Sequence, residues 1–424
     1  MSEIDLAALR AEPPRERPVL DLRAGMPDAS GSRVIVTVLY CGQGMANFLE
    51  FYDLDQDDGD APMATALLDF GVDLWFMSAE KKAVLVGPAV KFVTGRLQAL
   101  IDAGREPRID FTIFSHQDAD HWALIDYLLW AVEDKQIDMK VGPIWYGGAD
   151  WGKSASAAVG RFAAYSDQPD GEEVIPLEDG RCDYPGPTKA LKDLVTWGEV
   201  AIRILASNID VGSSDRGMRR NGTSACVVVE CGGNTIILPG DATYETFEFI
   251  NPKLKAYGTR SPVRPVYALS VPHHGSLRSF VSGYPRTLDY SLGRKFAELL
   301  AAENAVASAG YWNRHKHPYA EIMKVFSAYT EPDSAHDYIA YSYASSRWQA
   351  FTTTTSLYTT VLALAHPIQY KNYEFWLQKE TDGPVLRRIS GPGLEPRVSV
   401  AGEARAAAGA DAGARPPALA SAPA

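Results

Sequence analysis

The sequence is short of cysteine, and it has neither an excess of positive charge nor an apolar run long enough to span a bilayer. Its cysteines form no Cys-x-x-Cys pair and no zinc-ribbon spacing; they are Cys41, Cys182, Cys226 and Cys231. This pattern indicates reduced cysteines that pack in the core, not a disulfide framework. The first thirty residues lack the continuous apolar segment of a secretory signal. We therefore predict a cytoplasmic protein with no membrane partner.

Charge and composition narrow the range of partners. The net charge of −12 disfavours broad electrostatic binding of nucleic acid, because such binding relies on Lys and Arg that neutralise phosphates. A local basic patch is compatible with this total. The hydrophobic fraction of 46% and the charged fraction of 22% are typical of a globular protein with a sizeable core. The oligomeric state is left open.

The densest group of chemically active side chains lies in residues 111–122, FTIFSHQDADHW. A short apolar run leads into His116, Asp118, Asp120 and His121, and apolar residues at helical spacing follow. The pattern predicts a buried strand, a tight loop and an amphipathic helix. Two imidazoles and two carboxylates this close are costly to hold together unless a cation neutralises them. We predict a metal site; the alternative is an ordinary loop whose aspartates cap the helix.

Two further motifs follow apolar strands. Gly240-Asp241 ends the run IILP and places one carboxylate at a strand end, although Gly-Asp is also a common turn. His273-His274 follows the strand YALSV and precedes Gly-Ser. Adjacent histidines in this position indicate contact with a metal or a substrate.

The order of predicted elements indicates two β-rich halves with helices outside. Strands are expected over 34–40, 47–52, 65–70, 141–146, 201–206, 225–230, 235–238, 266–271, 305–309, 352–360 and 373–378, and helices over 88–103, 292–302 and from about 318. We predict one α/β (α+β) domain over 32–398 with αββα layers and an insertion at 149–195. A flexible leader (1–31) and a disordered Ala/Pro-rich tail (399–424) would flank it.

Together these motifs resemble the metallo-β-lactamase superfamily. The order SHQDADH (115–121), GD (240–241) and PHHGS (272–276) is similar in particular to the soluble β-lactamase-like domain of the ComEC/Rec2 DNA-internalisation proteins. VTVLYCGQG (36–44), LLDFG (67–71), NGTSACVVVE (221–230) and SAGYWNRHKHP (308–318) resemble other segments of that branch. The resemblance runs from about residue 33 to 320 and implies an αββα metallo-β-lactamase sandwich.

The resemblance also implies a ligand set for divalent metal. His116 and Asp118 would hold a first ion, Asp120, His121 and His273 a second, and Asp241 would bridge them. No histidine lies between His121 and His273, so the third histidine of the usual first site is missing. The first site would be oxygen-rich, which favours Mn or Mg over Zn, or would be filled weakly. We predict one or two divalent ions, Zn or Mn, with Mg as a further candidate.

Residues outside this ligand set are candidates for substrate contact. His274 and Ser276 would contact a substrate phosphate, and Asn313 and His317 would orient the substrate or act as general acid. The alternative for His317 is a capping or packing role at a helix start. The predicted catalytic group consists of Asp120, His274 and His317.

The predicted function is that of a metal-dependent hydrolase, a phosphodiesterase or nuclease that uses a metal-activated hydroxide. Its partner would be nucleic acid or a small phosphodiester. One alternative is hydrolysis of a lactone, thioester or cyclic nucleotide in a pocket shaped by the 149–195 insertion. Another is a binding or regulatory module that has lost turnover, which the missing histidine and the acidic charge favour. A pocket closed by the insertion would favour a small molecule, and an open basic groove would favour a nuclease.

Overall fold

The structure is a computed structural model of the 424-residue chain. It describes residues 4, 6, 18–26, 31–57, 59–74, 77–166, 174–178, 191–213, 215–257, 263, 265–310, 315–362, 369–378 and, as backbone only, 385–390. Parts of the predicted leader and insertion, the predicted tail, Cys182 and Asn313 lie outside the described residues.

Two eight-stranded β-sheets form the centre of the described fold, and the first has the order β20-β19-β2-β3-β4-β6-β8-β9. Its strands are β2 (Ser32–Val38), β3 (Ala46–Asp53), β4 (Ala64–Phe70), β6 (Phe111–Phe114), β8 (Ile144–Tyr146), β9 (Val174–Pro176), β19 (Lys371–Gln378) and β20 (Val385–Ser390). β20, β19, β2, β3 and β4 pair antiparallel, whereas β4, β6, β8 and β9 run parallel.

The second sheet has the order β1-β10-β11-β12-β13-β14-β15-β18. Its strands are β1 (Leu20–Asp21), β10 (Asp193–Trp197), β11 (Val200–Ala206), β12 (Cys226–Cys231), β13 (Asn234–Leu238), β14 (Val266–Ser270), β15 (Asn304–Ala307) and β18 (Leu357–Thr359). β10 to β13 pair antiparallel, and β13, β14, β15 and β18 run parallel. β1 lies within the segment predicted as a flexible leader, yet its two residues pair with β10.

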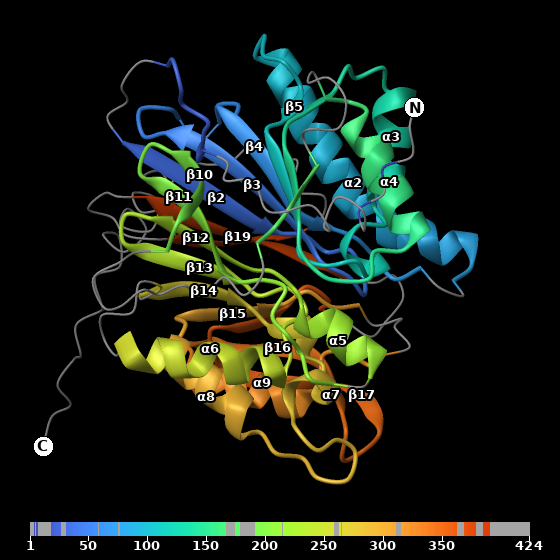
Figure 1. Ribbon diagram of the computed structural model, residues 1–424, viewed down its shortest axis with the longest axis vertical. Helices are drawn as coiled ribbons and strands as arrows, with labels where there is room; N and C mark the ends of the chain where they lie inside the picture. Colours follow the sequence, from blue (N-terminus) through green and yellow to red (C-terminus); the bar gives the residue numbers. More distant parts are fainter. Residues whose placement is uncertain are drawn as a thin grey trace, which may run out of the picture.

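Helices cover the outer face of each sheet, as Figure 1 shows. α2 (Ala79–Asp102), α3 (Ile125–Asp134) and α4 (Lys153–Ala163) lie on the first sheet, and α6 (Tyr244–Tyr257), α8 (Ser291–Leu300) and α9 (Ala320–Ser327) lie on the second. The short elements are α5 (Arg216–Gly222), α7 (Leu277–Phe280), η1 (Ala119–His121) and η3 (Pro272–Gly275). Two small sheets pair β5 (Arg108–Ile109) with β7 (Lys140–Val141) and β16 (Pro332–Ser342) with β17 (Arg347–Thr355). The predicted αββα sandwich is confirmed.

The buried core explains why the central strands read as nearly continuous apolar runs. One cluster lies between the sheets and joins Val36 and Leu49 of the first to Ile202 and Val229 of the second. Two other clusters join each sheet to its helices. Every residue of β2 and β4 is buried, because both faces of the sheet are covered.

α2 is the one helix in the described part of the chain that is long and apolar enough, by length and composition alone, to cross a membrane. Its apolar side chains, such as Leu85 and Phe92, are buried against the first sheet, so it packs as a core helix. It begins at Ala79, after the N-cap Ser78, and not at Pro88 as predicted. The proline lies inside the helix because the buried apolar face continues N-terminal to it.

The cysteines that the structure describes belong to the core. Cys41, Cys226 and Cys231 are free and buried. Burial raises the pKa of the Cys41 thiol to about 12, so this thiol is protonated and unreactive at neutral pH. These three residues therefore pack as the sequence predicts.

The ends of the parallel strands of both sheets meet at one edge of the sandwich. Asp69 is the penultimate residue of β4, and the residues that follow strands are Ser115 after β6, Asp241 after β13, His273 after β14 and Ser308 after β15. The backbone joins the two sheets here, because Ala225 N–H donates to the Ser115 carbonyl at 2.9 Å. Loops that follow parallel strands are where α/β folds place ligands.

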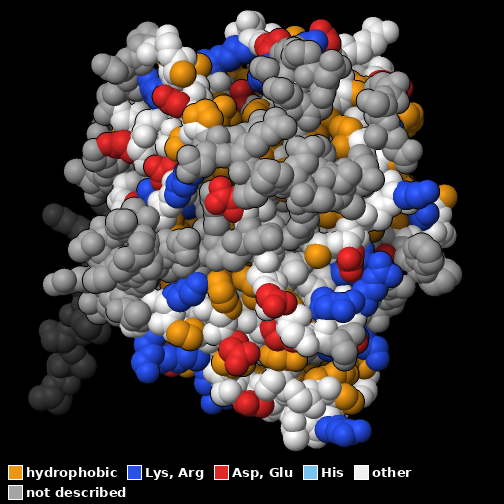
Figure 2. Space-filling model, viewed as in Figure 1, with side chains coloured by type: hydrophobic (Ala, Val, Ile, Leu, Met, Phe, Trp, Pro, Cys, Tyr) orange, Lys and Arg blue, Asp and Glu red, His pale blue; other side chains and the backbone are white. Residues whose placement is uncertain are grey.

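A basic surface lies beside this edge. In Figure 2, Lys and Arg side chains gather over α5. The helix carries Arg216, Arg219 and Arg220, and its N-cap Asp215 pairs with Arg278 of α7. An acidic chain thus has a local basic patch, which can attract anionic ligands despite the total charge.

Candidate metal centre

Asp69 holds the predicted metal loop against the end of β4. Its Oδ1 accepts a hydrogen bond from the Ser115 backbone N–H at 2.7 Å, and its Oδ2 accepts one from the Ser115 hydroxyl at 2.7 Å. The φ of Asp69 is 55°, a left-handed conformation that turns the chain at the strand end. Because His116 follows Ser115 directly, these bonds fix where the loop leaves β6.

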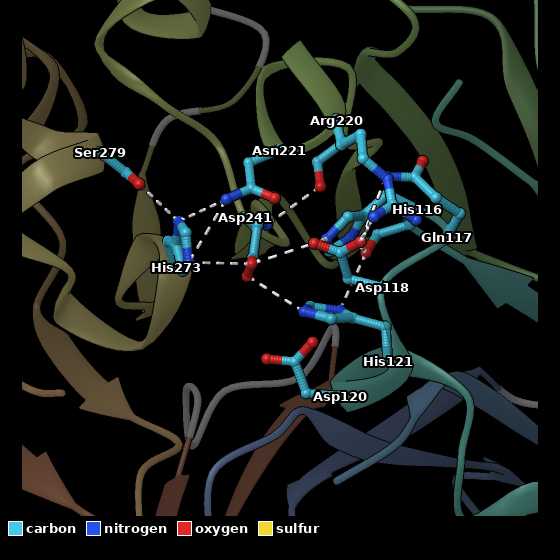
Figure 3. Close-up of polar contacts among 12 residues, drawn as sticks. His116, Gln117, Asp118, Asp120, His121, Arg220, Asn221, Asp241, His273 and Ser279 are labelled. Atoms are coloured by element: carbon cyan, nitrogen blue, oxygen red, sulfur yellow. Dashed lines mark hydrogen bonds and ion pairs between the residues drawn. The ribbon is translucent and has the colours of Figure 1, made fainter. Parts of the chain in front are cut away.

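Asp241 is the common neighbour of four histidines. Its Oδ1 lies 3.0 Å from Nε2 of His121 and 3.5 Å from Nε2 of His274. Its Oδ2 lies 3.2 Å from Nε2 of His273 and 3.5 Å from Nε2 of His116. Figure 3 shows Asp241 between His273 on one side and His116 and His121 on the other. The two oxygens of one carboxylate therefore face two pairs of imidazoles.

The Oδ1 side forms what we call the compact set: Asp120, His121, His274 and Asp241. Their ligand atoms all lie within 4.8 Å of one another, and in the described part of the chain this is the one group of His, Cys, Asp and Glu residues that is so close. Asp120 Oδ2 lies 3.5 Å from His274 Nε2. Imidazole and carboxylate ligands in this number can hold a divalent metal such as Zn.

The Oδ2 side forms what we call the open set: His116, Asp118, His273 and the shared Asp241. His116 Nε2 lies 3.8 Å from Asp118 Oδ2. The sequence-based assignment placed His273 with Asp120 and His121, but the structure brings His274 there and places His273 opposite His116. These consecutive residues diverge because both have left-handed φ values, 46° and 53°, within the tight turn η3. The open set therefore has two imidazoles, one more than predicted.

Each of the four imidazoles is held from behind through Nδ1. The partners are Asp69 Oδ2 for His121 (2.8 Å), the Ser308 carbonyl for His274 (2.8 Å), Ser279 Oγ for His273 (2.6 Å) and Ser115 Oγ for His116 (3.1 Å). Such partners fix the tautomer and the direction of the ring, and they leave Nε2 available to a metal.

The centre of the cluster contains buried polar atoms without hydrogen-bond partners. Nε2 of His116, His121 and His274 and Oδ1 of Asp241 are buried and form no hydrogen bond of good geometry in the described structure. Buried polar atoms in this state are costly, and most native proteins avoid them. A divalent cation would satisfy these atoms, so the residues fit a metal in the compact set and offer further ligands in the open set.

The charges of the cluster move its pKa values in opposite directions. Burial lowers the pKa of His273 to about 4 and holds that of His116 well below its usual value. Burial alone would lower the pKa of His121, but Asp241 and Asp69 hold it well above the usual value. Burial alone would raise the pKa of Asp241, but His273 and His121 hold it well below. The cluster thus favours a protonated His121 imidazolium beside the Asp241 carboxylate. A metal cation can take the place of that proton.

Two glycines allow the site loops to approach one another. A Cβ at Gly71 would overlap the backbone of Asp120 and His121. Gly240 has a φ of 54°, and a Cβ there would lie 2.9 Å from the Ser115 side chain. Both positions therefore require glycine for the metal loop and the Asp241 loop to meet.

A cavity of about 610 Å³ opens onto the cluster. It is lined by the ligands Asp118, Asp120, Asp241 and His273, the cations Lys153, Arg220 and Arg278, and the aromatic residues Trp122, Tyr284 and Tyr319. The start of α4, within the predicted 149–195 insertion, forms part of its wall through residues 152–155. Its volume is in the usual range for small-molecule sites.

The remaining predicted residues fall in different places. Ser276 and His317 line the cavity, but His274 is fully buried in the compact set and is not among the lining residues. This position argues against substrate contact by His274, because metal ligands surround its Nε2. Burial, helped by His273, holds the pKa of His317 well below its usual value, so at neutral pH its imidazole is uncharged. Asn313 lies outside the described residues.

Sequence reasoning gave no role to several residues that support the ligands. Asp69 had a visible signal, since an acidic residue and a glycine end an apolar strand. Ser279 and Ser308 had none, because Ser279 lies on α7 and Ser308 follows β15, and both meet their histidines through tertiary packing. Arg220 lines the cavity, and its Nη1 lies 3.1 Å from Asp118 Oδ1.

No family model and no curated protein sequence matches the chain. Solved structures similar to it include the metallo-β-lactamase fold protein YhfI from Bacillus subtilis, with 15% identity over 70% of this chain and 93% of that one and a TM-score of 0.34. A diphosphatase of the PhnP family has 10% identity over 76% and 98% of the two chains, with a TM-score of 0.33. A point mutant of the CmlA β-hydroxylase has 13% identity over 69% and 47%, with a TM-score of 0.33. The function is therefore argued from the site itself.

Proposed function

We propose that this chain is a metal-dependent hydrolase of the metallo-β-lactamase superfamily that cleaves phosphodiesters. The observation that carries the proposal is the position of Asp241, whose two oxygens face two pairs of imidazole Nε2 atoms. A carboxylate shared by two ligand sets is the arrangement that two-metal hydrolysis uses. Its kinship would be with the soluble ComEC-type domain, whose motifs it resembles, and its location would be the cytoplasm.

The compact set would hold one divalent ion and the open set a second, with Asp241 shared between them. Both sets combine imidazole with carboxylate, which suits Zn or Mn better than Mg. When bound, the ions would stabilise charge on the phosphoryl oxygens and lower the pKa of water near neutrality. The serine and aspartate partners of the four histidines keep every Nε2 directed at this position.

Cavity residues supply the contacts that a phosphodiester needs. Arg220, Arg278 and Lys153 bind the anionic oxygens, and a guanidinium matches a phosphate geometrically. His317, uncharged at pH 7, forms a hydrogen bond to the substrate rather than delivering a proton from an imidazolium. Trp122 offers a ring held by its own hydrogen bond, in which Nε1 donates to the Gln117 carbonyl at 2.9 Å, and planar groups of a substrate can stack there.

The shape of the cavity favours a small phosphodiester, or the end of a nucleic acid strand, over the interior of a duplex. The start of α4 and the side chains of Tyr284 and Tyr319 line the cavity together with the ligands. A volume of about 610 Å³ accommodates one or two nucleotide-sized units and not a double helix. Because the basic patch over α5 can attract a polyanion, the end of a nucleic acid strand is the second candidate substrate.

Neutral substrates fit this cavity less well. A lactone or thioester gains less from three cationic side chains than an anionic ester does, because it carries no negative charge to attract them. A module that binds metal without turnover would also have oriented imidazoles. The cation-lined wall and the carboxylate shared by two ligand sets together favour hydrolysis of an anionic ester.

The test is a panel of substrates with the metal-loaded protein. Bis(4-nitrophenyl) phosphate, cyclic nucleotides, single-stranded DNA, RNA, plasmid DNA and an acyl lactone are incubated with Mn, Zn or Mg. We expect cleavage of the small diesters, loss of at least about 10³-fold in Asp241→Asn, and an unchanged thermal unfolding midpoint within a few degrees. Cleavage of the lactone alone, or full activity in Asp241→Asn, would reject the proposal.

A further inference from the structure

Two consecutive residues at the end of α5 contact two ligands of the open set. Arg220 Nη1 lies 3.1 Å from Asp118 Oδ1, and Asn221 Nδ2 lies 3.3 Å from His273 Nδ1. Figure 3 shows both side chains reaching the cluster from the same helix end. The compact set has no such neighbour, because in the described structure no Lys or Arg pairs with Asp120 or Asp241. The two sets therefore differ in their surroundings as well as in their spacing.

The backbone of this helix end is fixed on both sides. Asp215 caps the start of α5 by accepting a hydrogen bond from Met218 N–H at 3.0 Å. The Thr223 hydroxyl donates to the Arg220 carbonyl at 2.8 Å and accepts from Ala149 N–H at 3.2 Å. Arg220 thus starts from a defined position, and only its side chain has to move for its guanidinium to change partner.

The pair of Arg220 and Asp118 is one that can open. Their side chains are 27% and 29% exposed, so water reaches both groups and can solvate them when the pair opens. Arg220 also lines the cavity, and its Nε forms no hydrogen bond in the described structure. A phosphate oxygen that enters the cavity would therefore compete well for this guanidinium, because Arg binds phosphate through several N–H groups at once.

The same pair opposes a cation in the open set. The guanidinium engages one oxygen of a carboxylate that would otherwise serve the metal, and its charge repels a cation beside Asp118. The compact set has no such competitor. A first ion would enter the compact set without this opposition. A second ion, in the open set, would compete with the Arg220 guanidinium for Asp118 and would be repelled by its charge.

We propose that Arg220 couples entry of the second metal ion to binding of an anionic substrate. In the free protein Arg220 pairs with Asp118 and weakens the open set. When a phosphodiester anion occupies the cavity, Arg220 turns to its oxygens and releases Asp118 as a ligand. The open set then binds its ion more tightly when an anionic substrate is present. This coupling rests on the proposed function.

The test is a Mn²⁺ titration of the metal-free protein by calorimetry, with electron paramagnetic resonance to count free Mn²⁺. We expect one tight and one weak ion in the wild type. Dimethyl phosphate at millimolar concentration should strengthen the weak ion about five- to tenfold, and uncharged trimethyl phosphate should not. Arg220→Gln should bind the second ion about five- to tenfold more tightly without any anion and should lose the anion effect.

Matched variants separate this coupling from a general change of charge or fold. Arg219→Gln removes the same charge from the same helix at an exposed position and should titrate like the wild type. Arg220→Lys keeps the charge but not the planar donors, so it should keep a weak second ion and show a smaller anion effect.

The outcomes distinguish the two proposals. A second ion that is unchanged or weaker in Arg220→Gln, or an anion effect that persists in it, overturns the coupling. Two equally tight ions in the wild type overturn the coupling and leave the hydrolase proposal standing. Folded protein, checked by circular dichroism, that binds no Mn²⁺ in any form overturns both.

Discussion

Asp69 Oδ2 lies 2.8 Å from Nδ1 of His121, so an acidic residue at the end of one strand holds a ligand from the loop after the next strand in the sheet. The opposite nitrogen of the same ring lies 3.0 Å from Asp241, which comes from the other sheet. His121 therefore contacts one acidic residue from each of the two sheets. Its orientation depends on β4 as much as on its own loop, and this dependence can be tested.

Asp69→Asn should weaken metal binding by about 10- to 100-fold, as loss of such a partner does in other metal sites. Asparagine tolerates the left-handed backbone at this position, but an amide cannot accept hydrogen bonds through both of its polar atoms. Ser115 and His121 would then compete for one acceptor. Competition with a chromophoric chelator measures the affinity. Asp102→Asn, at the exposed end of α2, is the control, and equal affinities in the two variants would exclude an orienting role for Asp69.

Binding of the first ion should release protons at neutral pH. The pKa of His121 lies well above its usual value, and that of His274 is also raised, because Asp241 outweighs the opposing effect of burial at both residues. A metal needs the neutral imidazole, so it displaces the protons that these rings hold below their raised pKa values. The apparent affinity should therefore increase with pH. Calorimetry in two buffers of different ionisation enthalpy should give a release of about one proton or more at pH 7, and equal heats would contradict this.

The two adjacent histidines should differ in the ion that each retains. His274 belongs to the compact set, so His274→Ala should lose the tightly bound ion. His273 belongs to the open set, so His273→Ala should keep one tight ion and lose the weaker one. Metal analysis after gel filtration, with thermal unfolding as the check on folding, separates the two variants. The reverse result would restore the assignment made from the sequence, with His273 beside Asp120 and His121.

The layers of the fold could be predicted from the order of strands and helices together with the family resemblance, and that resemblance also implied the ligand set. Apolar strands that lead into acidic or histidine residues place those residues at one sheet edge, and the structure brings His116, Asp118, Asp120 and His121 together there. The partition of the cluster could not be predicted. It depends on two consecutive left-handed residues in η3, and no periodicity in the sequence reports such a backbone.

The elements missed from the sequence are also those that depend on tertiary packing. α5 is a short helix with three arginines and two glycines, and its composition indicates a loop. It forms because Asp215 caps it and Thr223 closes it. Its role at the site comes from Arg220 and Asn221 meeting ligands that lie far from them in the chain. Contacts of this kind are set by the docking of a helix against the ligand loops, which a single sequence does not encode in a readable pattern.

Substitution of His317 should distinguish hydrogen bonding from proton delivery. The side chain is 6% exposed and lines the cavity, and its Nδ1 lies 3.4 Å from Gln43 Nε2. Because burial and the neighbouring histidines hold its pKa well below the usual value, the imidazole is uncharged at neutral pH. A neutral hydrogen-bonding residue can be replaced by glutamine, so His317→Gln should keep kcat for bis(4-nitrophenyl) phosphate within about tenfold, while His317→Ala should lose more. A residue that delivers a proton would lose about 10²- to 10⁴-fold in both variants and would remove one limb of the pH profile. Equal and large losses in the two variants would therefore return His317 to the role of general acid.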